Sequence, residues 1–206
     1  QGPIDPAKLE RAVRLTREAG AWVVPTMALW EVLYLTLPLE TLQAYPELRY
    51  VSPQSVQGWV NAYNQRRNAP EFDAATSRRV IEARQQVLAA LHRGGAGILM
   101  GTDAPQQFSV PGFSLHREFP RMRAAGMTPY EILASGTRNV GEYFQRIDAF
   151  GTIAVGKRAD LLLLDADPLA DVANLQRIAG VMVRGRWVPR EEIRAGLEAI
   201  AARHAR

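Results

Sequence analysis

Apolar residues in the first half of the chain fall into stretches with helical spacing, separated by short unbroken runs. Residues 6–19 and 70–93 place their apolar side chains three or four positions apart, which predicts two amphipathic helices. Residues 21–26 and 97–101 are instead almost continuously apolar, as is typical of short strands that helices cover on both faces of a parallel sheet. Pro25 cannot donate a hydrogen bond to a neighbouring strand, so the first strand should end there.

Helices also dominate the stretches around these strands. Residues 27–52 are irregular, which predicts short helices and loops, and Ser52 then caps a further helix that begins with proline. Helices are predicted from about 114 to 125, from Thr128, which begins a capping box, and over 137–146. This alternation of helices and strands is typical of an α/β fold with parallel strands.

The pattern changes near residue 151, where a β-rich segment begins. Residues 159–165 read as a strand and residues 181–188 as a hairpin, and residues 189–203 have the spacing of a closing helix. We therefore divide the chain into an α/β part, residues 1–150, and a β-rich segment with a terminal helix, residues 151–206.

Composition narrows the class of protein. The chain has 206 residues, of which 47% are apolar and 22% charged, as in a folded globular protein. No run reaches the roughly 18 apolar residues that a membrane span needs. The absence of cysteine excludes disulfides and cysteine-bound metals and fits a cytoplasmic protein. The first residues show no signal-peptide pattern, and because they begin with Gln1 rather than methionine, we do not expect residue 1 to be the natural start.

The chain is rich in arginine, since only Lys8 and Lys157 of its 25 basic residues are lysines. Guanidinium groups suit phosphates, so a nucleic-acid binder is one hypothesis, and it predicts strongly salt-dependent DNA binding. However, the arginines are dispersed among 21 acidic residues, which favours an ordinary solvated surface. We therefore expect no nucleic-acid partner.

Asp103 is the leading candidate for chemistry. Sites in parallel α/β folds lie beyond the carboxyl ends of the strands, where Asp103 follows the second strand and Thr26 ends the first. A carboxylate there could bind a metal ion, act as a general base, or do both. The alternative is a structural role, because aspartate after a strand also caps turns.

Histidine offers fewer candidates. His116 follows the loop that Asp103 begins, so it could contact substrate or simply be a half-exposed residue in the first turn of a helix. His92 lies at a helix end, where it would favour the helix dipole, and His204 lies in the terminal helix. We interpret both as structural. Ser114 is not expected to form a catalytic triad, because it lacks a nucleophile-elbow sequence.

Several segments together resemble the amidohydrolase superfamily, in particular its imidazolonepropionase-like and Xaa-Pro dipeptidase-like members. In chain order they are Val24-Pro25-Thr26, Gly101-Thr102-Asp103-Ala104, residues 126–133, residues 151–161 and the hairpin at 181–185. The most specific is Gly-Thr-Ile-Ala-Val-Gly-Lys-Arg-Ala-Asp-Leu at 151–161. The matching segments extend over nearly the whole chain.

The resemblance implies a metal-dependent hydrolase built on a (β/α)8 barrel. The chain would supply the last two barrel strands with their helices, a segment of a small β-sandwich and the terminal helix. Asp103 would be both metal ligand and catalytic residue, while Thr26, Thr102 and His116 would bind substrate. Lys157 would be structural, as would Asp160, because both belong to the sandwich segment.

The chain also departs from the family, since it has no His-x-His motif and only three histidines. A catalytic zinc ion usually needs three protein ligands. The resemblance therefore implies the carboxyl-terminal part of an enzyme, inactive alone, whose one or two divalent ions, zinc by expectation, are bound mostly by residues outside this chain. The expected reaction is hydrolysis of an amide, peptide or cyclic amide, in which Asp103 takes a proton from the attacking water and passes it to the leaving nitrogen.

The sequence also leads to expectations about binding partners and about the irregular segment at residues 27–70. We expect a small or dipeptide-like substrate, the remaining amino-terminal part of the barrel and possible homo-oligomers. The alternative is a non-catalytic interaction subunit, or a half-enzyme that a partner chain completes. Residues 27–70 are far longer than most connections between strands, so we predict a lid or a substrate-selecting insertion there.

Overall fold

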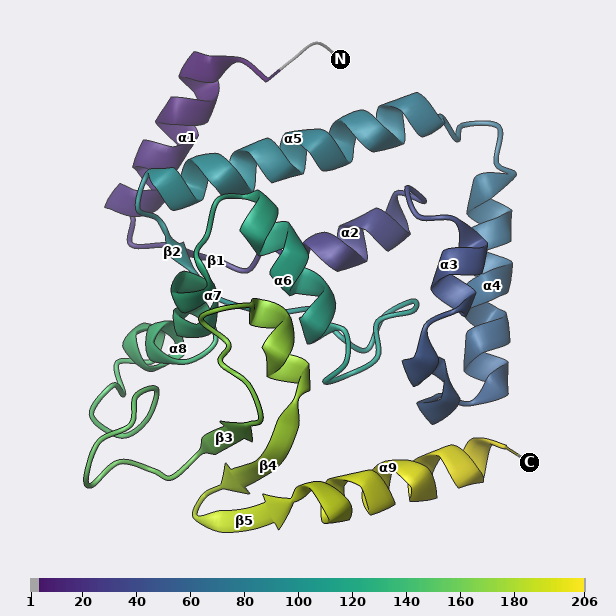
Figure 1. The fold of residues 1–206 in the computed structure, drawn as a ribbon. Coiled ribbons are helices and arrows are strands. Elements are labelled where there is room, and N and C mark those ends of the chain that lie inside the picture. Colours follow the sequence, from purple (N-terminus) through teal and green to yellow (C-terminus); the bar gives the residue numbers. More distant parts are fainter. Residues whose placement is uncertain (1–3, 206) are drawn as a thin grey trace.

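Two short parallel strands lie to the left of the centre in the view of Figure 1, in a computed structural model that describes residues 4–205. Strand β1 (Trp22–Val23) pairs with β2 (Gly97–Ile98), and Trp22 stands opposite Gly97 in the register. A Cβ atom added at Gly97 would lie 2.6 Å from the Trp22 ring, so the absence of a side chain lets that ring cross the strand. The predicted α/β fold with parallel strands is confirmed.

Two helices, α1 (Pro6–Glu18) and α5 (Ala74–Arg93), precede these strands and pack against one another. Helix α1 matches its prediction, but α5 begins four residues later than the predicted start at residue 70. The reason is local, since the side chain of Asp73 accepts hydrogen bonds from the backbone amides of Ala75 and Thr76 and so caps the helix.

The segment between β1 and α5 forms a separate helical insertion made of α2 (Met27–Leu33), α3 (Leu39–Gln43), the 3-10 helix η1 (Pro46–Tyr50) and α4 (Pro53–Arg67). It has its own apolar cluster, in which Val32, Leu42 and Tyr63 surround Phe108. Phe108 belongs to the loop that follows Asp103, and it is almost fully buried. The insertion therefore anchors the loop after β2.

Three helices follow that loop: α6 (Leu115–Ala124), α7 (Pro129–Ser135) and α8 (Arg138–Tyr143). The capping box is confirmed, because Thr128 and Glu131 each accept a hydrogen bond from the other's backbone amide. The main core gathers side chains from α2, α5, β2, α6 and α7 and from the segment that follows them, and its members are Met27, Leu88, Ile98, Phe119, Met122, Ala125, Met127, Ile132, Val172 and Leu175.

The last part of the chain is a three-stranded antiparallel sheet of β3 (Leu161–Leu164), β4 (Ile178–Val183) and β5 (Arg186–Pro189), followed by α9 (Arg190–His204). The 3-10 helix η2 (Val172–Gln176) packs on α6 and brings Val172 and Leu175 into the main core. The predicted hairpin and terminal helix are confirmed. The boundary at residue 151 stays a prediction.

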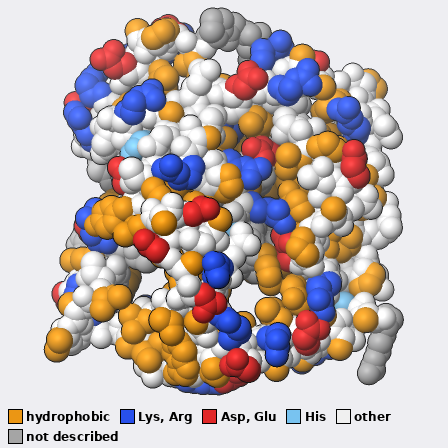
Figure 2. Space-filling model, in the orientation of Figure 1, with side chains coloured by type: hydrophobic (Ala, Val, Ile, Leu, Met, Phe, Trp, Pro, Cys, Tyr) orange, Lys and Arg blue, Asp and Glu red, His pale blue; other side chains and the backbone are white. Residues whose placement is uncertain are grey.

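Both strand groups leave apolar side chains exposed. Val24, directly after β1, is 47% exposed, so the prediction that residues 21–26 are buried on both faces is wrong at this position. Leu162, Leu163, Val183 and Trp187 are also exposed on the three-stranded sheet, and apolar side chains gather over this region in the space-filling view (Figure 2). The described residues therefore cover each sheet only in part.

Candidate active site

The carboxyl ends of β1 and β2 lie side by side. The amide of Leu99 donates to the carbonyl of Val23 over 2.9 Å, which continues the ladder past the assigned strands. Beyond it, a Cβ atom on Gly101 would lie 2.5 Å from Cγ1 of Val24, so the two segments remain in contact. The residues that follow directly are Thr26 on one side and Thr102 and Asp103 on the other.

Both strand ends turn sharply at a non-glycine residue. Thr26 has a φ of 45° and Asp103 a φ of 55°, both in the left-handed region. Aspartate tolerates this region better than most residues, whereas threonine, being β-branched, is strained there. Such strain costs on the order of 1–3 kcal/mol and is often found at functional sites, where the surrounding structure must hold it. Thr26 therefore needs support from its neighbours.

Asp103 is exposed, and Thr102 beside it is half-buried. The hydroxyl of Thr102 accepts a weak hydrogen bond of 3.4 Å from the amide of Ala104, so a local turn contact is made by Thr102. An exposed carboxylate at a strand end, on a segment held by neighbouring backbone, can accept a proton or bind a cation.

His116 lies in the first turn of α6, where its ring packs edge-on against Phe119 with 5.3 Å between ring centroids. Its Nδ1 is buried without a hydrogen-bond partner among the described residues. Burial lowers the pKa of His116, an effect that the nearby Glu47 carboxylate partly offsets. The contacts found within residues 4–205 do not join His116 to Asp103, and its expected role in substrate binding stays a prediction.

Lys157 and Asp160, for which the resemblance implies a structural role, both make contacts within the carboxyl-terminal part of the chain. Lys157 donates to the carbonyl of Ile147 and to the hydroxyl of Thr152. Asp160 accepts from the backbone amide of Arg184 over 2.7 Å, which holds the β3 end against the turn between β4 and β5. That hydrogen bond lowers the pKa of Asp160, with a further contribution from the adjacent Arg158.

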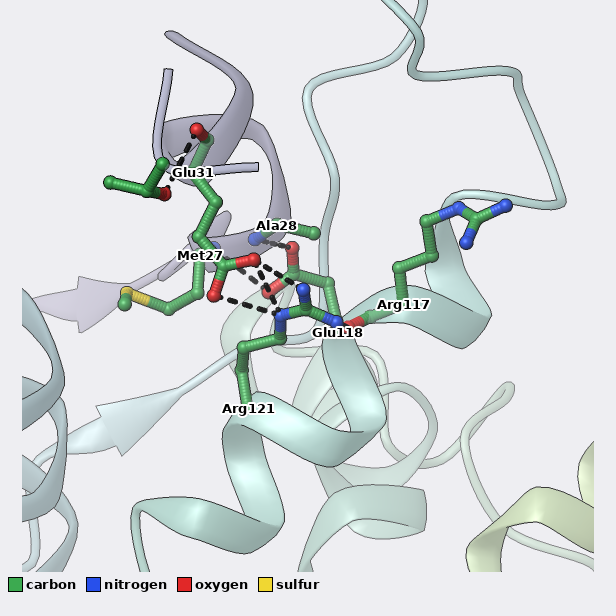
Figure 3. Close-up of polar contacts among 7 residues, drawn as sticks. Met27, Ala28, Glu31, Arg117, Glu118 and Arg121 are labelled. Carbon is green, nitrogen blue, oxygen red and sulfur yellow. Dashed lines mark hydrogen bonds and ion pairs between the residues drawn. The ribbon is translucent and has the colours of Figure 1, made fainter. Parts of the chain in front are cut away.

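A buried carboxylate, Glu118, was missed by the sequence reasoning. It lies on α6 and is 0% exposed. Its oxygens accept hydrogen bonds from the backbone amides of Met27, at 2.9 Å, and Ala28, at 2.7 Å (Figure 3). Burial raises the pKa of Glu118 to about 7, against the opposing effect of these two hydrogen bonds. The available signal was an acidic residue next to Phe119 in the apolar face of a predicted helix.

Two buried ion pairs accompany Glu118 on the same helix. Arg121 pairs with Glu31 of α2, with Nε to Oε1 at 3.1 Å, and Arg117 pairs with the almost fully buried Glu47 of η1, with Nε to Oε1 at 3.0 Å. Helix α6 is therefore bound to the helical insertion through three charged side chains.

The described residues do not suffice for a metal centre. Among them, no group of three or more His, Asp or Glu side chains is close enough together to hold an ion. Asp103 could supply one carboxylate ligand, whereas a bound zinc ion usually has at least three from the protein. An ion at this edge would therefore need ligands from elsewhere.

The surface charge and the hydropathy of the helices do not point to a second kind of site. Basic and acidic side chains are interspersed over the visible face (Figure 2). Within residues 4–205, the helices are too short or too polar to cross a membrane.

Comparison with known proteins finds one matching family and several similar solved structures. The Amidohydrolase family model matches residues 5–188. No curated protein sequence matches significantly. Solved structures that superpose on the chain include a bottromycin amidohydrolase (21% identity, TM-score 0.69, 90% of this chain and 40% of the other). A Xaa-Pro dipeptidase with bound methionine also superposes (21% identity, TM-score 0.60, 87% of this chain and 37% of the other). So does another amidohydrolase (25% identity, TM-score 0.58, 87% of this chain and 37% of the other).

The chain thus spans only about 40% or less of the length of these three structures. Their superposition is consistent with an α/β fold that corresponds to part of a (β/α)8 barrel.

Proposed function

Because the chain belongs to the amidohydrolase family, we propose that it forms the Asp103-bearing part of a hydrolase that cleaves carbon–nitrogen bonds in amides, peptides or cyclic amides. The observation that carries this proposal is the placement of Asp103 at the carboxyl end of β2, beside Thr26 at the end of β1, inside the matched region. Active sites of barrel enzymes lie at this face.

Asp103 has the role of a general base followed by a general acid. Its carboxylate accepts a proton from water as the water oxygen bonds to the substrate's carbonyl carbon. It then returns this proton to the leaving nitrogen as the carbon–nitrogen bond breaks. Thr26 and Thr102 flank Asp103 at this edge and bind the substrate, and His116 on α6 contributes from the far end of the loop.

The amidohydrolase family is generally metal-dependent, and a divalent ion, zinc in this proposal, would polarise the carbonyl and activate water. The described residues offer this ion a single carboxylate, Asp103, so they do not by themselves fit it. The step proposed for Asp103 is therefore proton transfer by its own carboxylate.

The remaining strands of the barrel must also come from elsewhere. A cavity of about 390 Å³ lies beside the β1 segment, and its apolar lining includes Val23 and Val24 from that segment and Val80 and Val87 from α5. Among the described residues β1 pairs with β2 alone, so its other edge is open. We propose that a further parallel strand covers this edge, since an open strand edge with apolar neighbours tends to pair. The strand belongs to the amino-terminal part of the same enzyme.

The same open edge supports the second candidate, an interaction subunit that a separate partner chain completes. In that case the purified 206-residue chain would bind the partner tightly and the complex, rather than one polypeptide, would carry the metal ligands. A cytoplasmic location is part of both proposals and rests on the absence of cysteine.

A substrate panel tests the proposed activity. The polypeptide or complex that contains this chain is supplied with Zn²⁺ and assayed for amine release from an Xaa-Pro dipeptide, an N-acyl amino acid and a cyclic amide. We expect hydrolysis of at least one of the three and none by the 206-residue chain alone. If the metal-loaded protein hydrolyses none of them, the proposed activity is wrong.

A further inference from the structure

Helix α2 begins directly after the strained turn at Thr26, and its own sequence does not cap it. Thr26 occupies the N-cap position, but its side chain makes no hydrogen bond to the first turn. The first amides of any helix lack partners within the helix and need them from elsewhere. For α2 these partners are the two carboxylate oxygens of Glu118, one on the amide of Met27 and one on that of Ala28.

The carboxylate of Glu118 is committed to these backbone amides rather than to an arginine. The arginines near it on α6 pair with other carboxylates, Arg121 with Glu31 and Arg117 with Glu47. Figure 3 shows Glu118 directed at the start of α2, while Arg117 leaves the helix in another direction. Since Glu118 is fully buried, water cannot substitute for these two hydrogen bonds.

The position of Glu118 along the chain gives this contact its significance. Thr26 ends β1 and immediately precedes Met27, whereas α6 follows the loop that begins at Asp103 and carries His116 in its first turn. A single side chain therefore connects the residue after one strand end to the helix that follows the other strand end. The contact spans 91 positions in sequence at Met27.

We propose that Glu118 is a positioning residue of the hydrolytic site proposed above: by capping α2 with both carboxylate oxygens, it holds the left-handed turn at Thr26 in register with the Asp103 loop. Glu118 does not touch the substrate. It acts through Thr26, which directly precedes the two amides that Glu118 binds. The inference rests on the proposed function for its catalytic consequence, but not for the structural contact.

Ionisation should control the contact, because both oxygens of a carboxylate are strong acceptors. Protonation turns one of them into a hydroxyl, which is a much weaker acceptor for a backbone amide. The charged groups that face it are Arg121 on its own helix and Glu31 on α2, and they have opposite effects on the carboxylate. Arg117 and Glu47 pair next to them, at η1.

The experiment combines hydrogen exchange at the amides of Met27 and Ala28 with steady-state kinetics, on the same protein. Glu118→Gln keeps the size of the side chain and removes one acceptor oxygen. Glu47→Gln is the matched control, because Glu47 is also a buried carboxylate bound to α6, yet it does not contact α2's first turn. Exchange is expressed as protection relative to the free peptide at each pH.

We expect Glu118→Gln to lower the protection of one of the two amides by roughly tenfold or more relative to other amides of α2. Glu47→Gln should lower the protection of Met27 and Ala28 no more than that of those other amides. In the wild type, protection of that amide should fall as the pH drops through about 7, and in Glu118→Gln it should not depend on pH. With an active protein, kcat should fall roughly 10- to 100-fold in Glu118→Gln with little change in KM, as for a misplaced site.

Unchanged protection of Met27 and Ala28 in Glu118→Gln would overturn the cap itself, whether or not the protein hydrolyses anything. Lost protection with wild-type kcat would overturn the positioning role. If the protein hydrolyses no substrate in the panel, but Glu118→Gln alone lowers the protection of these amides, the proposed function is wrong and the cap is confirmed.

Discussion

Glu118 accepts a hydrogen bond of 2.7 Å from the backbone amide of Ala28, which lies 90 residues earlier in the chain. This buried contact links the helix that follows Asp103 to the helix that follows Thr26, and so joins the two strand ends at which the candidate site lies. Its carboxylate also has the largest pKa change described for an acidic group in residues 4–205, a rise to about 7.

Glu118→Gln should change how stability depends on pH. Burial raises the pKa of Glu118 from 4.5 to about 7, so the folded protein holds this proton more tightly than the unfolded chain does. The stabilisation from the protonated group is complete below pH 4.5 and is lost as the pH rises through about 7. At about 1.4 kcal/mol per pKa unit, the free energy of unfolding should fall by about 3 kcal/mol over this window.

Urea unfolding of both proteins at pH 5 and pH 8 measures this difference. We expect the wild type to lose about 2 to 3 kcal/mol relative to Glu118→Gln between the two pH values, because part of the effect is already lost at pH 5. A difference between the proteins that stays constant with pH would show that Glu118 titrates at its ordinary value.

Arg121→Gln should be far more damaging than a matched change on the surface. The side chains of Arg121 and Glu31 are only 22% and 15% exposed, so removing the arginine strands a largely buried carboxylate. Breaking a buried pair typically costs about 3 kcal/mol or more. Arg14→Gln removes the exposed pair with Glu18, which should cost less than about 1 kcal/mol.

Thermal and urea unfolding of the two variants side by side provide the measurement. Equal losses of stability in Arg121→Gln and Arg14→Gln would mean that the pair between α6 and α2 is solvated in solution.

Gly97→Ala should loosen the strand pair that carries the site. An added Cβ would lie 2.6 Å from the ring of Trp22, closer than real contacts allow, so the ring or the strand must shift. Overpacking of this kind typically costs about 1–3 kcal/mol. Gly58→Ala in α4 is the control, because its Cβ would meet nothing within 4 Å, and alanine in a helix should add about 0.5–1 kcal/mol.

Unfolding free energies and tryptophan fluorescence report on both variants. A wild-type spectrum and stability in Gly97→Ala would contradict the close crossing of Trp22 over β2.

The local part of the fold was predictable because its signals lie within a few residues. The capping box at Thr128, the hairpin turn at Arg184-Gly185 and the helix after Pro189 depend on neighbouring residues alone. The common edge for Thr26 and Asp103 was also predictable, since parallel strands end on the same side. The start of α5 was placed at residue 70, four residues too early, because the cap that Asp73 makes was not recognised.

Long-range contacts could not be read from the sequence. The role of Glu118 depends on backbone amides 90 and 91 residues away, and nothing in its surroundings marks them. Phe108 was equally hidden, because a loop aromatic becomes a core residue only when the helical insertion packs around it. Burial of Val24 was overestimated, since an apolar run shows that a strand can be buried but not which segments cover it.

The most direct test of the assigned site is the turnover of Asp103→Asn, compared with Asp148→Asn, in the metal-loaded protein that contains this chain. Asparagine keeps the shape of Asp103 but cannot accept the proton, so kcat should fall roughly 100- to 10,000-fold while the unfolding midpoint stays close to that of the wild type. Asp148 is an exposed acid away from the strand ends, and its variant should keep full activity. Wild-type turnover in Asp103→Asn would contradict the assignment.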